Sequence, residues 1–204
     1  MWTRGAYFFL AGHLRAFLAL AFALGLFPAE ATADAPKPYI DAQQEVAPPL
    51  GFEGVCQRYI WACARAGGAG PAGRDALVIA EQVNLNINRQ TREIADDVQY
   101  RTEEYWALPT EVGGDCEDFA LAKKRALIQR GIAPERLLIA TVLDRSRKPH
   151  AVLIFRTDGG DLVLDNLTDR ILGWHQTGYT YLRMQNPLAP HRWTAVLSGG
   201  ILGG

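Results

Sequence analysis

Residues 113–131 read GGDCEDFALAKKRALIQRG, and this stretch has the features of a helix with a thiol at its start. The paired glycines break the preceding segment, and Asp115 is a favoured N-cap residue. Glu117 and Asp118 complement the positive end of the helix dipole, and Gly131 supplies a C-terminal stop. We therefore expect a helix that begins at Cys116.

The segment before this helix has a helical pattern of apolar residues, whereas the segments after it have the pattern of strands. From residue 75 to about residue 90, apolar residues recur at spacings of three and four, which predicts a second helix with one buried face. Helices followed by strands, without β-α-β alternation, predict an α+β fold in which these helices pack on an antiparallel sheet. The predicted strands lie after Pro134, at 137–143, 151–156 and 162–165, with weaker candidates at 179–184 and 193–197.

A hairpin register places two polar residues together. If the turn is centred on Asp158-Gly159, the numbers of paired residues add up to 317, so Asp165 lies opposite Val152. His150 and Asp165 are then diagonal neighbours on one face, about 7–8 Å apart at the backbone. An imidazole and a carboxylate can close that gap with a hydrogen bond.

The same strand face carries Val152, Ile154 and Val163, and we expect it to pack against the helix that begins at Cys116. That packing would bring the thiol to His150. A helix N-terminus and a neighbouring imidazolium stabilise a thiolate, His150 would move the proton, and Asp165 would orient the imidazole. The three residues thus form a candidate Cys-His-Asp nucleophile set.

Each of these residues also has an ordinary structural interpretation. A cysteine at a helix start is often a small buried apolar residue beside normal capping residues. His150 can simply begin a strand, and Asp165 with Asn166 can simply form a turn. The functional interpretation depends on their joint occurrence in compatible places.

Asp115, Glu117 and Asp118 bring three carboxylates next to the thiol, more negative charge than one helix cap needs. This charge would disfavour a thiolate, which suggests a compensating cation. Hard oxygen ligands of this kind suit Ca²⁺. The spacing is not that of an EF-hand, and a solvated acidic helix start is the alternative.

The N-terminus predicts export. Arg4 and Arg15 precede an uncharged run at 16–27, and the small residues Ala31-Thr32-Ala33 suit a signal peptidase, so residues 1–33 are predicted to be a cleaved signal peptide rather than a membrane anchor. Residues 34–54 are predicted to form an extended, proline-containing arm, 55–198 the domain, and 199–204 a flexible tail. The net charge of −1, with scattered arginines, gives no indication of nucleic acid as a partner.

Three cysteines in an exported chain form an odd set. A bridge between Cys56 and Cys63 would leave Cys116 free, and an oxidising compartment allows it. The spacing leaves both a disulfide and two buried thiols open.

Five blocks of sequence together match a known pattern. They are Tyr105-Trp106-Ala107-Leu108-Pro109-Thr110-Glu111, Gly113-Gly114-Asp115-Cys116-Glu117-Asp118-Phe119-Ala120, Ala122-Lys123, His150-Ala151-Val152-Leu153 and Val163-Leu164-Asp165-Asn166-Leu167. In these blocks the sequence resembles the bacterial transglutaminase-like cysteine proteinases, and the resemblance covers most of the predicted mature chain, from about residue 51 to about residue 181. One departure is the short segment between Glu111 and Gly114, which affects the expected wall of a cleft.

The resemblance implies a papain-like or transglutaminase-like core with Cys116 as nucleophile, His150 as base and Asp165 as orienting residue. It also implies a Ca²⁺ site on Asp115 and Glu117, with Asp118 as the third ligand. It further implies a periplasmic protease that cuts a large surface adhesin at a double-alanine motif, releasing biofilm, and that is sequestered by an inner-membrane receptor sensing cyclic-di-GMP.

Two other functions are compatible with the same residues. A transglutaminase would pass the acyl group from Cys116 to an amine instead of to water, and the sequence does not separate these outcomes. A Ca²⁺-responsive binding protein would keep the fold without turnover. Thiol reactivity distinguishes the binding protein, and product masses distinguish the two enzymes.

Overall fold

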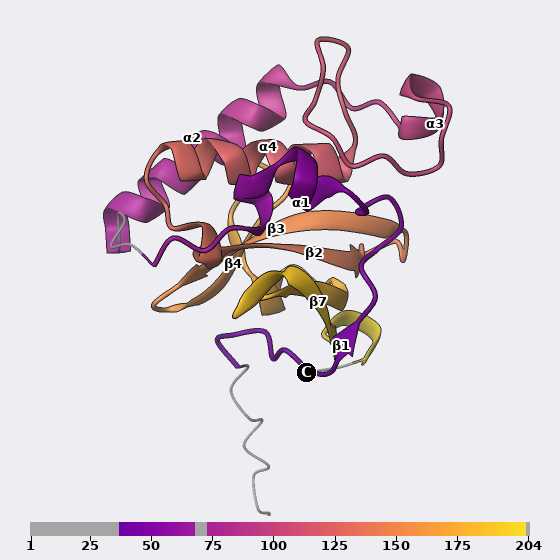
Figure 1. Ribbon diagram of the computed structural model, residues 1–204. Coiled ribbons are helices and arrows are strands. Elements are labelled where there is room, and N and C mark those ends of the chain that lie inside the picture. Colours follow the sequence, from indigo (N-terminus) through magenta and orange to yellow (C-terminus); the bar gives the residue numbers. More distant parts are fainter. Residues whose placement is uncertain (1–36, 68–72, 203–204) are drawn as a thin grey trace, which may run out of the picture. The chain divides into compact units, whose positions relative to one another are not determined.

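The computed structural model describes residues 37–67 and 73–202. It contains a seven-stranded sheet in the order β1-β7-β6-β2-β3-β4-β5, in which every neighbouring pair is antiparallel. Helices α2 and α4 lie together on one side of the sheet (Figure 1). The predicted α+β arrangement is confirmed, whereas the predicted signal peptide, residues 1–33, lies outside the described residues.

The helices and strands have the following bounds. The α-helices are α1 (Val55–Arg58), α2 (Gly73–Gln90), α3 (Asp96–Gln99) and α4 (Cys116–Gln129), and the short 3₁₀ helices are η1 (Ile60–Cys63), η2 (Pro134–Arg136), η3 (Trp174–Gln176) and η4 (Gly200–Leu202). The strands are β1 (Glu45–Val46), β2 (Leu137–Leu143), β3 (Pro149–Thr157), β4 (Gly160–Leu164), β5 (Leu172–Gly173), β6 (Thr180–Asn186) and β7 (Ala189–Ser198).

Helix α4 begins at Cys116 as predicted, and the two glycines before it are required by close packing. A Cβ on Gly113 would lie 2.1 Å from the carbonyl oxygen of Arg92, and one on Gly114 would lie 2.5 Å from Asp118 Oδ2. Asp115 occupies the N-cap position, but its side chain makes no capping hydrogen bond. Its carboxylate lies instead beside those of Asp96 and Glu117, as described below.

The β3–β4 hairpin has the predicted register. Thr157 pairs with Gly160 and Leu153 with Leu164, so paired numbers add up to 317. Strand β4 ends at Leu164, which leaves Asp165 just beyond the strand and free of the ladder.

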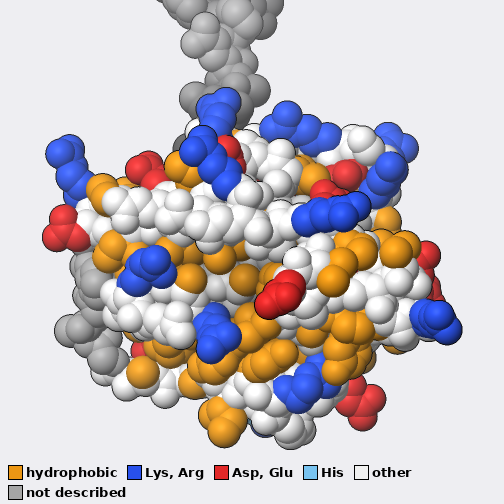
Figure 2. Space-filling model, turned by 90° about the horizontal axis from the view of Figure 1, so that it is seen from above, with side chains coloured by type: hydrophobic (Ala, Val, Ile, Leu, Met, Phe, Trp, Pro, Cys, Tyr) orange, Lys and Arg blue, Asp and Glu red, His pale blue; other side chains and the backbone are white. Residues whose placement is uncertain are grey.

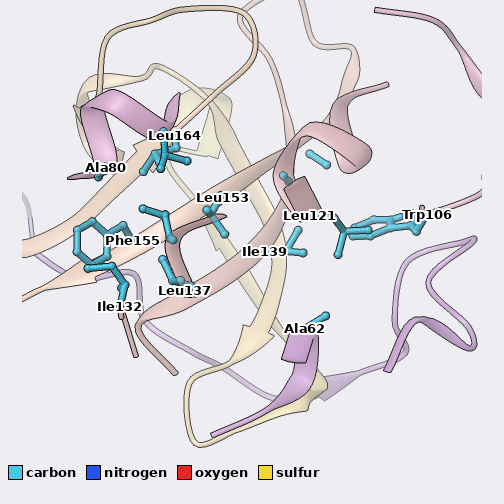
Figure 3. Packing of buried hydrophobic residues seen from close by; sticks show 14 of the residues in the cluster. Ala62, Ala80, Trp106, Leu121, Ile132, Leu137, Ile139, Leu153, Phe155 and Leu164 are labelled. Carbon is cyan, nitrogen blue, oxygen red and sulfur yellow. The ribbon is translucent and has the colours of Figure 1, made fainter. Parts of the chain in front are cut away.

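The prediction that the Val152 face packs against α4 is wrong. The cluster that contains α4 and α2 uses the opposite face, through Leu153 and Leu164 (part of this cluster is shown in Figure 3). Val152, Ile154 and Val163 instead form a second cluster with Trp174 and Tyr179. Since side chains alternate along a strand, residues 151 and 153 must face α4 if 150 and 152 face away.

The two ends of the described chain are more integrated than predicted. The arm at 34–54 contributes β1, which pairs with β7, and its Ile40 is buried with a backbone N–H that donates to Asp161 Oδ2 at 2.8 Å. The predicted tail, 199–204, contains η4, where the N–H of Ile201 donates to Thr180 Oγ1. The domain therefore extends beyond 55–198 on both sides.

A disulfide joins Cys56 and Cys63, with the two Cα atoms 5.5 Å apart. The bridge closes the turn between α1 and η1, so the helical geometry there provides the bend that so short a spacing needs. Cys116 is left as the free thiol.

On the face shown in Figure 2, lysine and arginine side chains are spread over the surface among acidic ones, with apolar side chains between them. No helix in the ranges 37–67 and 73–202 combines the length and the apolar character needed to cross a membrane.

Gln185 on β6 connects the two layers. It is fully buried, and its Oε1 accepts hydrogen bonds from Lys124 Nζ (2.8 Å) and Ile139 N (3.1 Å). Its Nε2 donates to the carbonyls of Ala62 (3.2 Å) and Pro190 (2.8 Å). Burial lowers the pKa of Lys124 to about 7. The hydrogen bond to Gln185 Oε1 supplies the polar contact that this buried amine needs.

We expect Gln185→Leu to lower the free energy of unfolding by about 1–3 kcal/mol, because it leaves the buried Lys124 amine without its partner. Urea denaturation measures the change. The double variant Lys124→Met/Gln185→Leu is expected to recover part of the loss, since no buried amine remains. A single variant within about 0.5 kcal/mol of wild type would contradict this assignment.

Candidate active site

A cleft of about 250 Å³ lies where the start of α4 meets the start of β3, and both Cys116 and His150 line it. Its other walls come from the N-terminal arm, the loop before α4, and strands β2 and β6. Although His150 belongs to the sheet face that points away from α4, it is the second residue of β3. At the strand end it reaches the same cleft as the thiol.

The Cys116 thiol is mostly buried and has two polar neighbours apart from its own backbone. It donates to Glu117 Oε2 at 3.2 Å, and the backbone N–H of Ala151 lies within hydrogen-bonding reach of its sulfur. Burial raises the pKa of Cys116 well above its usual value, and the charges of Glu117 and Asp115 raise it further. In this arrangement the resting group is a thiol.

The predicted contact between His150 and Asp165 is present, with Nε2 2.8 Å from Oδ1 and both side chains buried. Burial alone would raise the pKa of Asp165, but the hydrogen bond and charge of His150, with the hydroxyl of Tyr179, hold it below its usual value. An ionised carboxylate only accepts hydrogen bonds. Nε2 must therefore carry the proton, which leaves Nδ1 of a neutral imidazole able to act as a base.

The structure brings Cys116 and His150 to one cleft without a hydrogen bond between them among the described residues, because the thiol proton is directed to Glu117. Catalytic hydrogen bonds are often loose before a ligand binds. The positions of Cys116, His150 and Asp165 are thus compatible with their predicted roles.

The acidic residues beside the thiol divide into two groups. Asp96, Asp115 and Glu117 each offer a carboxylate oxygen, and these three oxygens lie within 4.8 Å of one another. Asp118, the third ligand expected from the sequence, is outside this group. Its Oδ1 accepts the backbone N–H of Ala107 at 2.7 Å, so it fixes the loop before α4.

The three grouped carboxylates fit a metal ion. Each has one buried oxygen, Asp96 Oδ1, Asp115 Oδ1 or Glu117 Oε1, without a hydrogen-bond partner. Burial and mutual repulsion raise the pKa of Asp115 to about 6 and that of Glu117 to about 10. Such orphaned oxygens in a buried set are what a divalent cation with oxygen ligands would satisfy.

Asp96 was not predicted from the sequence as a site residue. It starts α3 and lies beside Asp115 because the segment before it runs along Gly114: Ile94 N donates to the Gly114 carbonyl, and Gly114 N donates to the Arg92 carbonyl. Nothing in the residues around Asp96 indicates this long-range pairing.

The model for the family described as bacterial transglutaminase-like cysteine proteinase matches residues 42–200. The chain belongs to this family. The matched segment begins inside the predicted arm and ends inside the predicted tail, in line with the strand pairing of β1 and the packing of η4. With the family shown, the chain is a transglutaminase-like cysteine protease.

Solved structures of LapG from Legionella pneumophila are similar to this family member. The calcium-bound form is 25% identical, with a TM-score of 0.52, over 63% of this chain and 74% of the LapG chain. The EGTA-treated form is 28% identical over 56% of this chain and 66% of the LapG chain, with a TM-score of 0.48. No curated protein sequence matches the chain.

The buried acids predict an unusual pH dependence of stability. Unfolded Asp and Glu titrate near pH 4, whereas burial raises the pKa of Asp115 to about 6, of Asp118 to about 8 and of Glu117 to about 10. Between pH 5 and 7 the metal-free native state therefore holds protons that the unfolded chain has lost. Its stability must fall as the pH rises through this window.

In chelator, we expect the Tm measured by circular dichroism to be lower at pH 7 than at pH 5. Glu117→Gln should flatten the dependence because it removes the most strongly shifted group. The buried Lys123 and Lys124, with pKa lowered to about 7, titrate at the upper end of the window and beyond. A Tm in chelator that rises from pH 5 to pH 7 would contradict the buried acid cluster.

Proposed function

We propose that this protease is a periplasmic, calcium-dependent endopeptidase that cleaves a large surface adhesin and so releases cells from a biofilm. The main support is the cleft in which the free thiol of Cys116 meets His150, whose imidazole is hydrogen-bonded to Asp165. Three carboxylates with buried, orphaned oxygens lie beside the thiol. The resemblance to the family supports the substrate and the compartment.

In the proposed reaction Cys116 is the nucleophile. Its proton passes to Nδ1 of His150, and the sulfur attacks the scissile carbonyl carbon to give a tetrahedral intermediate. Phe119 is the first residue of α4 whose N–H bonds back to Asp115, so the backbone N–H groups before it in the first turn have no helical acceptor. The N–H of Glu117 contacts its own carboxylate, and the N–H of Cys116, at the nucleophile itself, is the proposed donor to the oxyanion.

His150 then returns the proton to the leaving amine, and the acyl group stays on Cys116. Water, deprotonated by His150, attacks the thioester and regenerates the thiol. Asp165 keeps the proton on Nε2 throughout, so that Nδ1 is presented to the thiol in the base form.

The residues that would hold calcium are Asp96, Asp115 and Glu117. When bound, the ion would supply positive charge beside a nucleophile whose pKa is raised by the neighbouring Glu117 and Asp115. Without that charge, the same carboxylates disfavour the thiolate, and the thiol donates its hydrogen bond to Glu117. We therefore expect turnover to require calcium.

The decisive experiment uses the N-terminal fragment of a large adhesin from the same genome. Mature protein is incubated with the fragment in Ca²⁺ or in excess chelator, and products are identified by mass spectrometry. We expect new termini in Ca²⁺ only, and none with Cys116→Ala, whose circular dichroism should match wild type. Cleavage by Cys116→Ala would overturn the assignment, and covalently crosslinked products would point to transamidation instead.

Asp96 provides a test of the metal site that does not depend on turnover. Asp96→Asn removes one of the three charges, and we expect it to weaken Ca²⁺ binding by at least about tenfold in isothermal titration calorimetry, the scale of loss for altered metal-site residues. Asp97→Asn is the matched control, because Asp97 is the exposed neighbour on α3. Equal affinities of the two variants would exclude Asp96 from the site.

Localisation and regulation are proposed from the sequence and the family resemblance. Export predicts a mature N-terminus at Asp34, which N-terminal sequencing of the periplasmic fraction tests; a precursor retained with residues 1–33 would contradict it. An inner-membrane receptor that senses cyclic-di-GMP is the proposed partner. Co-purification with the periplasmic domain of such a receptor would test it, and failure to bind would remove it.

A further inference from the structure

Tyr179 makes a contact with the Asp165 carboxylate that the proposed reaction does not yet use. Its hydroxyl lies 2.5 Å from Asp165 Oδ2, and the side chain is buried. Since an ionised carboxylate can only accept, the tyrosine hydroxyl must be the donor. This is a short hydrogen bond, within the range of charge-assisted bonds from a hydroxyl to a carboxylate.

The two oxygens of Asp165 have separate partners. Oδ1 accepts from His150 Nε2 and from the backbone N–H of Leu167 at 3.0 Å, whereas Oδ2 accepts from Tyr179 alone among the described residues. The backbone carbonyl of Asp165 is held separately by Asn88 Nδ2 at 2.9 Å. Tyr179 therefore provides the contact that fixes the rotation of the carboxylate while Oδ1 faces the imidazole.

The Tyr179 ring also packs against the imidazole directly. The ring centroids of His150 and Tyr179 are 5.9 Å apart, with planes at 86°, which is an edge-to-face arrangement. One residue thus contacts both members of the pair: the hydroxyl holds the carboxylate, and the ring limits the tilt of the imidazole.

The backbone around Tyr179 fixes the hydroxyl in place. Gly178 has a left-handed backbone with φ of 72°, and the N–H of Tyr179 donates to Thr177 Oγ1 at 3.2 Å. The Thr177 hydroxyl in turn donates to the carbonyl of Trp174 at 2.7 Å. The chain that enters β6 is therefore anchored immediately before the tyrosine.

A rigid hydrogen-bond donor matters because a cavity adjoins the Asp165 carboxylate. Asp165 and Tyr179 both line a second cavity of about 330 Å³, distinct from the cleft that holds Cys116, with Arg145 and Arg170 at its border. Without the tyrosine hydroxyl, Oδ2 would take its hydrogen bond from mobile water in that cavity. A water molecule does not fix the rotation of the carboxylate.

We propose that Tyr179 is a positioning residue of the protease: its hydroxyl locks the Asp165 carboxylate, and through it the tautomer and orientation of His150. The proposal rests on the proposed function, in which His150 is the base. It adds a fourth residue to the Cys-His-Asp set without contact between that residue and the substrate.

The test is Tyr179→Phe, which keeps the ring and removes the hydroxyl. The matched control is Tyr181→Phe, because Tyr181 is also buried in the same cluster and its hydroxyl contacts Thr177 and Trp174, not Asp165. With the adhesin fragment as substrate, we expect Tyr179→Phe to lower kcat by roughly 10- to 100-fold, the range found when the hydrogen-bond partners that orient metal-bound histidines are removed. KM should stay within about twofold, since substrate binding is untouched.

Nuclear magnetic resonance of ¹⁵N-histidine-labelled protein gives a readout independent of cleavage. In wild type and in Tyr181→Phe, the His150 Nε2–H proton should give a sharp downfield resonance. In Tyr179→Phe it should broaden or move upfield because the accepting carboxylate is free to rotate. This NMR measurement tests the proposal even if neither the wild-type protein nor any variant cleaves the substrate.

Two results would overturn the proposal. One is a Tyr179→Phe protein whose kcat and His150 resonance equal those of Tyr181→Phe. The other is an equal loss in both variants, which would assign Tyr179 a packing role only. A failure of the proposed function has a different signature, namely cleavage that persists in Cys116→Ala.

Discussion

The first turn of α4 rests against the first residues of β3, and the side chains of the site take their positions from that contact. The sulfur of Cys116 lies at the backbone N–H of Ala151, and His150 directly precedes Ala151. The apolar cluster that joins α4 to Leu153 and Leu164 maintains this approach, and the tight packing at Gly113 and Gly114 allows the chain to enter the helix there. Loosening this cluster would separate the thiol from the imidazole without changing either residue.

The same region concentrates buried acidic groups at a cost to stability. Asp96, Asp115 and Glu117 lie side by side with orphaned oxygens, and burial holds the pKa of Glu117 at about 10. A fold selected for stability alone would have no use for such a cluster, and perturbed groups of this kind gather at functional sites. The acids oppose the thiolate in the metal-free protein, so nucleophile and proposed calcium site are electrostatically coupled.

The sequence predicts local relations well and long-range ones poorly. The hairpin register that brings His150 to Asp165 follows from a two-residue turn, and the start of α4 follows from its glycines and acids. The packing of α4 does not follow, because periodicity shows that a strand has two faces but not which one a helix will cover. Asp96 and Tyr179 join the site through loop conformations that neither a periodic pattern nor a two-residue turn predicts, and their own neighbours carry no signal of it. The spacing of Cys56 and Cys63 does not fix the local backbone geometry either, so the sequence alone does not decide between a bridge and two thiols.

The most direct test of the account is the rate at which Cys116 reacts with iodoacetamide near neutral pH. Cys116 is the one free thiol of a chain with three cysteines, so the mass gain reports this residue alone. In this account Cys116 and His150 form one site, whose thiolate is controlled by the acids Asp96, Asp115 and Glu117. Calcium should then raise the alkylation rate of the wild-type protein far above the rate of an ordinary thiol of pKa about 8.5. His150→Ala should abolish the acceleration. Equal and slow rates in wild type and His150→Ala, with calcium present, would contradict the account.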